Sequence, residues 1–293
     1  NRRACDGLGQ GGVMFIDSAA AFDVRDYLRP QMMPHFLCPG CGHGIALRAL
    51  LWAVHDLGIA KDKLAVVSGI GCAGRLSAYV DANTFHVTHG RPLAYATGLA
   101  LARPDLHVVV ITGDGDCLAI GGNHLIHACR RNLKITCLML NNEIYGMTGG
   151  QVAPTSPVGA ITTTTPYGNL EDPFDMCAMA VVAGAAYVAR WRSTDFRQLA
   201  DSIKKGIQTR GLAFIEVLLQ CPTNFGRYVL KSSSPQDVIK WIQAHTVTHK
   251  EAEKMPPEER AGKYLVGEFV HRPEHKGIVE RYQDFLRARR KEF

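Results

Sequence analysis

Residues 107–142 read HVVVITGDGDCLAIGGNHLIHACRRNLKITCLMLNN, and this stretch decides the fold. It contains two continuous apolar runs, HVVVIT and KITCLML, which are typical of strands buried on both faces of a parallel sheet. Between them, residues 120–131 have the pattern of a helix. A helix between two buried strands predicts a β-α-β unit, in which the two strands lie parallel in one sheet.

The same alternation extends over most of the chain. Glycine after the last apolar turn, at Gly58 and Gly211, marks the ends of two predicted helices, and proline marks the start of others. We therefore predict an α/β fold with a doubly wound parallel sheet. The further predicted strands are residues 64–70, 186–191 and 213–219, and the further predicted helices are residues 43–57, 92–103, 173–183 and 194–210.

Two segments interrupt this alternation of strands and helices. Residues 151–172 are rich in Pro, Thr and Gly and too long for a simple connection, which favours a functional lid over the alternative of disorder. The tail from Lys231 is polar and ends in a predicted basic helix at residues 277–291. We divide the chain into an N-terminal extension (1–30), a central binding domain (31–230) and a C-terminal extension (231–293) that packs on a partner or on its own domain.

The composition narrows the class of protein. The 293 residues are 46% hydrophobic and include 29 glycines, which excludes a disordered, collagen-like or coiled-coil protein. No apolar run reaches the ~20 residues of a membrane span, and residues 1–20 lack the pattern of a secretory signal. The net charge of +6 is dispersed, so we expect neither nucleic acid nor a membrane as a partner. We expect a cytoplasmic protein whose nine cysteines are reduced thiols or metal ligands.

The glycine-rich turn after the first apolar run predicts a site for a diphosphate and its cation. The GDG of residues 113–115 follows one run and the NN of residues 141–142 follows the next, with 25 residues between GDG and NN. Both therefore lie at the carboxyl edge of the sheet, where open parallel sheets bind ligands. Mg²⁺ prefers hard oxygen ligands shared with phosphate, which Asp114, the Asn142 amide and the backbone carbonyl of Ile144 would supply. The glycines let the backbone approach the phosphates.

The spacing distinguishes three interpretations of this turn. A lone GDG is compatible with an ordinary tight turn, and a nicotinamide-binding domain requires G-x-G-x-x-G after its first strand, a pattern that follows none of the predicted strands. GDG followed by NN at this spacing matches the signature of thiamin diphosphate enzymes. Those enzymes need a second α/β half that holds the aminopyrimidine and an activating glutamate, and the sequence contains only the diphosphate half. We therefore predict a heteromeric enzyme.

Four cysteines lie in loops near the predicted site. Cys38 and Cys41 form a C-x-x-C pair before a predicted helix, Cys72 follows the first strand, and Cys221 follows the last. Four thiolates suit either zinc or a [4Fe–4S] cluster, and the residues alone do not separate the two. The remaining cysteines are interpreted as core residues (Cys129, Cys137 and Cys177), as ambiguous (Cys117) or as having no role (Cys5).

Taken together, these features resemble the β subunit of the 2-oxoacid:ferredoxin oxidoreductases, and within that family most of all the 2-oxoglutarate enzymes. The motifs that carry the resemblance occur in the family's order between residues 38 and 169. They are CPGCGHG (38–44), GIGCAGR (69–75), THGR (88–91), GDGD (113–116), NNEIYGMTGGQ (141–151), PTSP (154–157) and TTPYGN (164–169).

The resemblance implies roles for particular residues. It implies catalytic roles for His89, near the diphosphate, and for Arg75, where the family carries a basic residue facing the substrate carboxylate. His43 is a candidate to support a ligand or to cap a helix. It implies the diphosphate half of the thiamin diphosphate-binding fold, with Mg²⁺ on Asp114, Asn142 and Ile144. The implied ligands of one [4Fe–4S] cluster are Cys38, Cys41, Cys72 and Cys221. The implied contacts to thiamin diphosphate are Gly71, Cys72, His89, Gly113, Asp114, Gly115, Asp116, Asn142, Ile144, Tyr145, Gly146, Met147 and Thr148.

The resemblance also implies a reaction and its partners. The expected reaction is the reversible, coenzyme A-dependent oxidative decarboxylation of 2-oxoglutarate to succinyl-CoA and CO₂, with the electrons passed to ferredoxin. The α subunit would supply the pyrimidine-side domain, its glutamate and a domain that contributes to coenzyme A binding, in an (αβ)₂ heterotetramer. Three alternatives stay open: pyruvate or another 2-oxo acid as substrate, a non-redox thiamin diphosphate decarboxylase with structural zinc, and a non-catalytic zinc-stabilised scaffold.

Overall fold

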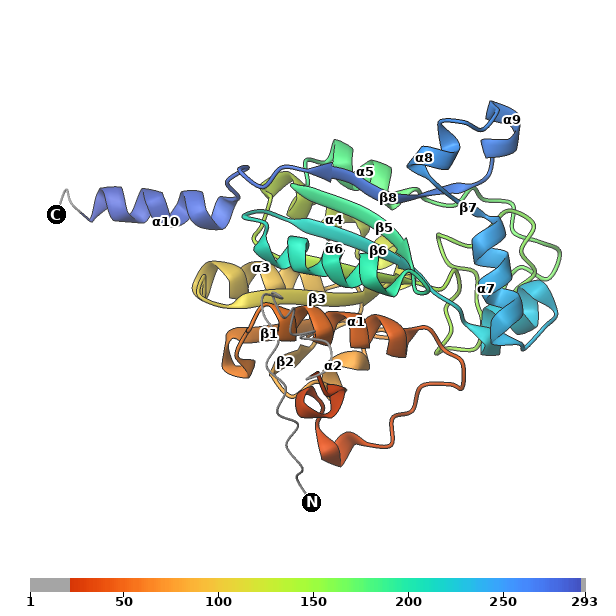
Figure 1. Ribbon diagram of the computed structural model, residues 1–293, viewed down its shortest axis with the longest axis horizontal. Coiled ribbons are helices and arrows are strands. Elements are labelled where there is room, and N and C mark those ends of the chain that lie inside the picture. The colour runs from red at the N-terminus through yellow and green to blue at the C-terminus, as the bar shows by residue number, and fades with distance from the viewer. Residues whose placement is uncertain (1–21, 291–293) are drawn as a thin grey trace, which may run out of the picture.

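Eight strands form one sheet through the middle of the molecule (Figure 1). The structure is a computed structural model that describes residues 22–290. Within that range the strands lie in the order β2-β1-β3-β4-β6-β5-β8-β7. They are β1 (Leu64–Ser68), β2 (Asn83–His86), β3 (His107–Gly113), β4 (Thr136–Asn141), β5 (Tyr187–Arg192), β6 (Ala213–Leu218), β7 (Thr246–Thr248) and β8 (Tyr264–His271).

The five predicted strands are present as β1, β3, β4, β5 and β6. Each of these strands pairs in parallel with its neighbours among them. Every residue of β1, β4 and β6 is buried, which is why these strands read as continuous apolar runs. The predicted doubly wound α/β fold is therefore confirmed.

The other three strands were not predicted, because their sequences lack such runs. The edge strand β2 has the sequence NTFH and is mostly exposed. In the tail, β8 pairs antiparallel with β5, and β7 pairs parallel with β8. The apolar run of β8 is interrupted by Gly267 and Glu268, and only two of its residues are buried. The sheet is thus mostly rather than wholly parallel.

Helices cover both faces of the sheet (Figure 1). One core joins α1, α2 and α6 to side chains such as Val66 and Ile111, and the other joins α3, α4 and α5 to Val67 and Val110. Neighbouring residues of one strand thus point into different cores. These helices are α1 (His43–Asp56), α2 (Leu76–Tyr79), α3 (Pro92–Ala102), α4 (Gly122–Arg131), α5 (Met176–Val182) and α6 (Phe196–Gln208).

The tail beyond the last parallel strand is folded onto the sheet. It contains α7 (Pro235–Ala244), α8 (His249–Ala252), α9 (Pro257–Arg260) and α10 (Ile278–Arg289), and α10 projects away from the rest of the molecule (Figure 1). The strand β8 is tied to the sheet by Arg190, whose guanidinium donates to Glu216 at 2.7 Å, to Asp175 at 2.6 Å and to the Leu265 carbonyl at 3.2 Å.

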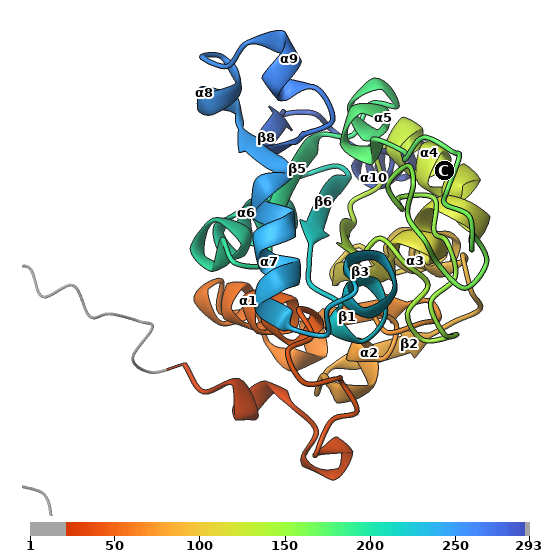
Figure 2. The same ribbon diagram turned by 90° about the vertical axis from the view of Figure 1, so that its right-hand side faces the viewer.

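The carboxyl ends of β1, β3, β4 and β6 lie at the edge of the sheet that faces the viewer in Figure 2, with α7 in front of them. Two π-helices, η5 (Gly115–Ile120) and η6 (Pro222–Leu230), follow β3 and β6 there, so the helix predicted at residues 120–131 begins five residues earlier as η5. The remaining short turns are η2 (Val24–Tyr27), η3 (Pro30–Met32) and η4 (Lys61–Lys63). Among residues 22–290, no helix combines the length and the apolar character needed to cross a bilayer.

Candidate functional site

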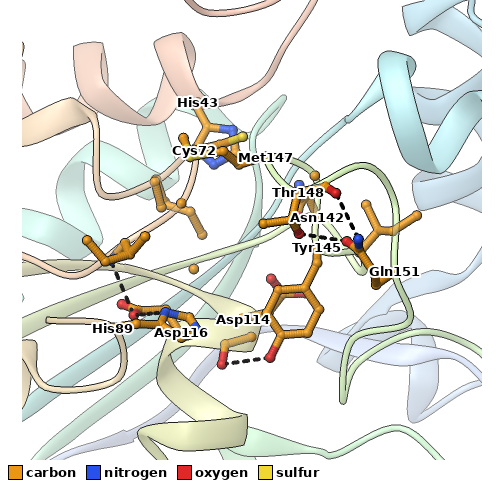
Figure 3. A pocket seen from close by; sticks show the side chains of 18 of the residues that line it. His43, Cys72, His89, Asp114, Asp116, Asn142, Tyr145, Met147, Thr148 and Gln151 are labelled. Carbon is orange, nitrogen blue, oxygen red and sulfur yellow. Dashed lines mark hydrogen bonds and ion pairs between the residues drawn. The ribbon is translucent and has the colours of Figure 1, made fainter. Parts of the chain in front are cut away.

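A cavity of about 600 Å³ opens at this carboxyl edge (Figure 3). Its walls come from the loops after β1, β3 and β4, from the loop around residue 89 and from His43 at the start of α1, so five segments of the sequence meet there. Every residue that the resemblance implies as a contact to thiamin diphosphate lines this cavity. Ile70, Gln151, Val152 and Thr164 also line it and were not predicted, although Gln151 closes the motif NNEIYGMTGGQ.

The turn after β3 depends on glycine. A Cβ atom on Gly115 would lie 2.2 Å from the ring of Tyr145, so a side chain here would displace that ring. The Tyr145 hydroxyl donates to the Gly115 carbonyl at 3.2 Å. The turn after β3 and the loop after β4 are therefore in direct contact, as their places at the ends of neighbouring strands predicted.

Three oxygen atoms converge between these two loops. The end of the Asn142 amide lies 2.9 Å from the Ile144 carbonyl oxygen and 3.3 Å from Asp114 Oδ1. The amide has two possible orientations at this position. If the nitrogen faces the two oxygens, it donates a hydrogen bond to both; if the amide oxygen faces them, three oxygens meet with no hydrogen between them. The second arrangement is favourable only around a cation. This donor set therefore fits Mg²⁺, which prefers oxygen ligands.

Asp114 is buried without a basic partner. Its side chain is 4% exposed, and burial raises the pKa of this carboxyl to about 6. Its Oδ2 accepts a hydrogen bond from the Thr155 hydroxyl at 2.6 Å, which leaves Oδ1 facing Asn142. A divalent cation at Oδ1 would compensate for the buried negative charge.

Thr155 belongs to the segment that was predicted as a lid. The neighbouring Ser156 hydroxyl donates to the Glu143 carbonyl at 2.6 Å, so two adjacent residues fasten this segment to the turn after β3 and to the loop after β4. Within that loop, Tyr145 and Gln151 form an antiparallel bridge, and Thr148 donates to the Gln151 side chain at 2.6 Å. The segment is thus ordered and part of the site.

Asp116 lies in the wall of the cavity. Its carboxylate accepts hydrogen bonds from His89 Nδ1 at 2.7 Å, the Gly90 amide at 2.6 Å, the Thr112 hydroxyl at 2.6 Å and the Ile70 amide at 3.3 Å. Its side chain is 2% exposed, whereas that of His89 is 36% exposed and faces the cavity (Figure 3). The carboxylate is therefore occupied by protein donors and orients His89.

A second cavity, of about 460 Å³, is lined by all four of the predicted cysteine ligands, Cys38, Cys41, Cys72 and Cys221. Burial raises the pKa of Cys41 to about 12 and that of Cys72 to about 11, so both thiols hold their protons in the absence of a metal. Among the described residues, no three His, Cys, Asp or Glu side chains gather closely enough to hold a single metal ion. The four sulfurs thus surround a space without converging on one point.

The two cavities share a wall. His43, Cys72, Asn142, Gly146 and Met147 line both of them. In Figure 3, His43, Cys72 and Met147 lie together at one end of the larger cavity, opposite His89 and Asp116. Burial lowers the pKa of His43, which is 2% exposed, to about 4. A group in either cavity would therefore touch the same few side chains.

The loop that carries Cys38 and Cys41 is supported by the tail. Gly40 has φ +75°, and a Cβ atom on it would lie 2.2 Å from the ring of Pro235 at the start of α7. Only glycine satisfies both the left-handed backbone and the close approach. The C-terminal helix α7 thus helps to shape a cysteine loop that lies almost two hundred residues earlier.

The remaining predicted residues have different positions. Arg75 is exposed and lines the cavity of the four cysteines, beside Cys72, rather than the larger cavity. Cys117, whose role the sequence left ambiguous, is buried in the apolar core with the three cysteines predicted there, Cys129, Cys137 and Cys177. Cys5 lies outside the described residues.

Comparisons with known proteins agree with this geometry. Residues 69–217, half of the chain, match the family of the thiamine pyrophosphate enzyme C-terminal TPP-binding domain. The matched range begins in the loop after β1 and ends within β6, so it contains the elements that line the larger cavity.

Curated relatives match over most of the chain. The 2-oxoglutarate synthase subunit KorB of Methanocaldococcus jannaschii is 52% identical over 85% of this chain and 92% of its own length. The protein of the same name from Methanothermobacter marburgensis is 52% identical over 84% of this chain and 86% of its own length. The 2-oxoglutarate oxidoreductase subunit KorB of Mycobacterium tuberculosis is 46% identical over 69% of this chain and 55% of its own length.

A solved structure shares the fold. It is 2-oxoglutarate:ferredoxin oxidoreductase from Magnetococcus marinus with 2-oxoglutarate, coenzyme A and succinyl-CoA bound. The chain matches it with a TM-score of 0.79 and 32% sequence identity, over 91% of this chain and 90% of the solved one.

Proposed function

This chain belongs to the family of KorB subunits of 2-oxoglutarate synthase, the β subunits of the 2-oxoacid:ferredoxin oxidoreductases, and from this premise we propose its reaction. Together with an α subunit, it catalyses the reversible, coenzyme A-dependent oxidative decarboxylation of 2-oxoglutarate to succinyl-CoA and CO₂. The two electrons pass through one [4Fe–4S] cluster of this subunit to ferredoxin.

The observation that carries this proposal is the wall between the two cavities. A cavity with the donor set for a diphosphate and Mg²⁺ adjoins a cavity lined by four thiols, and five residues line both. When bound in the larger cavity, thiamin diphosphate would supply the nucleophile and the electron sink that decarboxylation of a 2-oxo acid requires. An electron acceptor in the adjoining cavity would then lie next to the reacting group.

The residues of the larger cavity have distinct proposed tasks. Asp114, Asn142 and the Ile144 carbonyl hold Mg²⁺ and through it the diphosphate, and the glycines of residues 113–115 let the phosphates approach the backbone. His89, oriented by Asp116, presents its other ring nitrogen to the cavity, where it binds phosphate or polarises the substrate.

The arrangement of the four thiols supports a cluster rather than zinc. A tetrahedral zinc site brings its sulfurs to about 4 Å from one another, because each Zn–S bond is about 2.3 Å long. In the described residues the thiols line one 460 Å³ space without forming such a single-ion group. A [4Fe–4S] cluster binds each cysteine to a different iron and so needs sulfurs that surround a volume.

The proposal assigns Arg75 to the substrate. Arg75 is exposed beside Cys72, in a cavity whose wall it shares with Asn142, Gly146 and Met147. A dicarboxylate such as 2-oxoglutarate that extends past this wall would place its distal carboxylate near the guanidinium, which is suited to bidentate binding of carboxylates.

The α subunit completes the site. It would supply the pyrimidine-side domain, the activating glutamate and part of the coenzyme A site, in an (αβ)₂ heterotetramer. The loop between β4 and α5 exposes apolar side chains beside the cavity, of which Tyr167 is 100% and Leu170 92% exposed, and such a patch is typical of a protein interface. We also propose the domain division at residues 30 and 230, and a location in the cytoplasm.

Anaerobic co-expression with the α subunit allows a direct test. We expect iron and acid-labile sulfide in the purified complex, and bleaching of the cluster's visible absorbance that requires 2-oxoglutarate, thiamin diphosphate and Mg²⁺ together. Bleaching with pyruvate but not with 2-oxoglutarate would overturn the substrate and keep the reaction type. A colourless complex that contains zinc and still decarboxylates the substrate would overturn the redox function altogether.

A further inference from the structure

His43 lies at the junction of the two cavities and touches a proposed cluster ligand. It is the first residue of α1, and its Nδ1 lies 3.1 Å from the sulfur of Cys41. The position is fixed by the preceding residue, because a Cβ atom on Gly42 would lie 2.7 Å from Leu219, and the Gly42 amide donates to the Gln220 carbonyl at 3.0 Å. The start of α1 is therefore held against the end of β6.

The buried imidazole of His43 needs a hydrogen-bond partner. His43 is 2% exposed and lies on the same helix as the apolar core residues Ala46, Leu47 and Leu50. Burying an imidazole costs free energy unless its polar atoms are used. Among the described residues, the Cys41 sulfur is the side-chain atom that forms a hydrogen bond with the His43 ring. The contact with the Cys41 sulfur is therefore a feature of this position that an apolar side chain could not supply.

The direction of the hydrogen bond follows from the chemistry of the ligand. A cysteine that binds iron is a thiolate, which has no proton and accepts hydrogen bonds only. The proton between the two atoms must then be on Nδ1. Hydrogen bonds to the sulfurs of an iron–sulfur cluster stabilise its more negative, reduced form and so raise its reduction potential.

We propose that His43 sets the reduction potential of the cluster by donating an Nδ1–H hydrogen bond to the Cys41 thiolate. The raised potential would favour electron transfer to the cluster from the group bound in the larger cavity, across the shared wall. His43 is in this sense a positioning residue that acts through the cluster rather than on the substrate. The inference rests on the proposed cluster, and its test keeps the two apart.

Three substitutions separate the hydrogen bond from the shape of the ring. His43→Asn places an amide N–H near the position of Nδ1, His43→Gln places one near the more distant Nε2, and His43→Leu removes both donors. We expect the midpoint potential of the Leu and Gln variants to be more negative than that of the wild type, and the potential of the Asn variant to stay close to it. The potential is measured by EPR-monitored redox titration of the anaerobic αβ complex.

A histidine elsewhere on the same helix is the matched control. His55 is partly buried near the other end of α1, twelve residues after His43, and bonds to the Tyr27 hydroxyl at 2.8 Å; it lines neither cavity. His55→Leu removes a hydrogen bond from the same helix and should leave the potential unchanged. An equal shift in both Leu variants would mean that the effect comes from loss of helix stability, and would overturn the proposal.

Cluster content decides which of the two proposals fails. A wild-type complex without iron and sulfide contradicts the proposed function. A His43→Leu complex with full cluster content and an unchanged potential contradicts the role of His43 alone. If the Leu variant does not assemble its cluster, pulsed EPR of the reduced wild-type complex with ¹⁵N-labelled histidine gives the answer, because a hydrogen bond to Cys41 requires a nitrogen coupling and its absence excludes the bond.

Discussion

Asp116 and His89 form a partly buried acid–imidazole pair, with 2.7 Å between Asp116 Oδ1 and His89 Nδ1. The acid is 2% exposed and comes from the π-helix after β3, whereas the imidazole comes from the loop before α3. The same carboxylate also accepts from the Gly90 and Ile70 amides. One side chain thus holds together three segments at the carboxyl edge of the sheet.

Asp116→Asn should therefore impair the site by displacing His89 and the neighbouring loops. The amide brings two hydrogens of its own to a point where four protein donors converge, so at least one donor loses its acceptor. We expect activity of the αβ complex, or its affinity for thiamin diphosphate, to fall about 10–100-fold. Steady-state kinetics against thiamin diphosphate concentration measure this. The control is Asp105→Asn, an exposed acid paired with Lys63 and Arg103, and equal kinetics in the two variants would contradict the role of Asp116.

Thr155→Val should weaken the binding of Mg²⁺. The substitution keeps the shape of the side chain and removes the hydroxyl that donates to Asp114 Oδ2 at 2.6 Å. A lost hydrogen bond to a charged group costs about 1.5–3 kcal/mol, which corresponds to about a tenfold or greater loss of affinity. Titration of thiamin diphosphate binding with Mg²⁺ measures the effect. Thr155→Ser retains the hydroxyl and should bind Mg²⁺ like the wild type; if it is as weak as the Val variant, packing rather than the hydrogen bond is responsible.

Replacement of single cysteines should separate ligands from core residues. Cys221→Ser removes a thiol that lines the four-cysteine cavity, and we expect the complex to lose its iron, sulfide and visible absorbance. Cys129→Ala removes a core thiol that is 0% exposed, and should retain iron content while lowering stability by about 1 kcal/mol. Iron and sulfide analysis of the anaerobic complex gives the comparison. Full iron content in the Cys221 variant would exclude it as a ligand.

Gly40→Ala should reduce cluster content through the shape of its loop. The substitution combines a left-handed backbone, which costs about 1–3 kcal/mol for a residue with a Cβ atom, with a collision 2.2 Å from Pro235 Cγ. Gly58→Ala is the matched control, since Gly58 also has positive φ (+62°) but has open space at its Cβ position. We expect lowered iron content in the first variant only, partly restored by adding Pro235→Ala. Normal iron content in Gly40→Ala would show that α7 does not constrain the loop.

Much of the architecture was predictable because burial on both faces leaves a continuous apolar run. The runs at β1, β3, β4, β5 and β6 were recognised for that reason. The tail was read as a polar extension because β8 is half exposed and carries Glu268 in its middle. What joins β8 to the sheet is its antiparallel pairing with β5, together with Arg190 of that strand, whose guanidinium donates to the Leu265 carbonyl. No local pattern in residues 231–293 contains that information.

Within the site, the sequence predicted which strand ends meet, but it did not predict every contact of the side chains there. Asp114, Asn142 and Ile144 were predicted together because they end neighbouring strands, and the structure brings their oxygens to one point. Asp116 is implied as a cofactor contact by the resemblance, and it lines the larger cavity. What the sequence did not predict is that the turn of η5 also directs its carboxylate to His89, twenty-seven residues earlier.

The sequence alone was sufficient for the fold class and the family, and it predicts two ligand sets and a partner subunit, because each depends on residue types at fixed spacings on strand ends. The tertiary structure decided how these sets relate: that the larger cavity shares one wall, Cys72 included, with the cavity of the four thiols, that Arg75 lies in the cavity of the thiols, and that α7 packs against Gly40. The physical reason is that side-chain direction and loop packing depend on neighbours distant in sequence, which spacing along one chain does not specify.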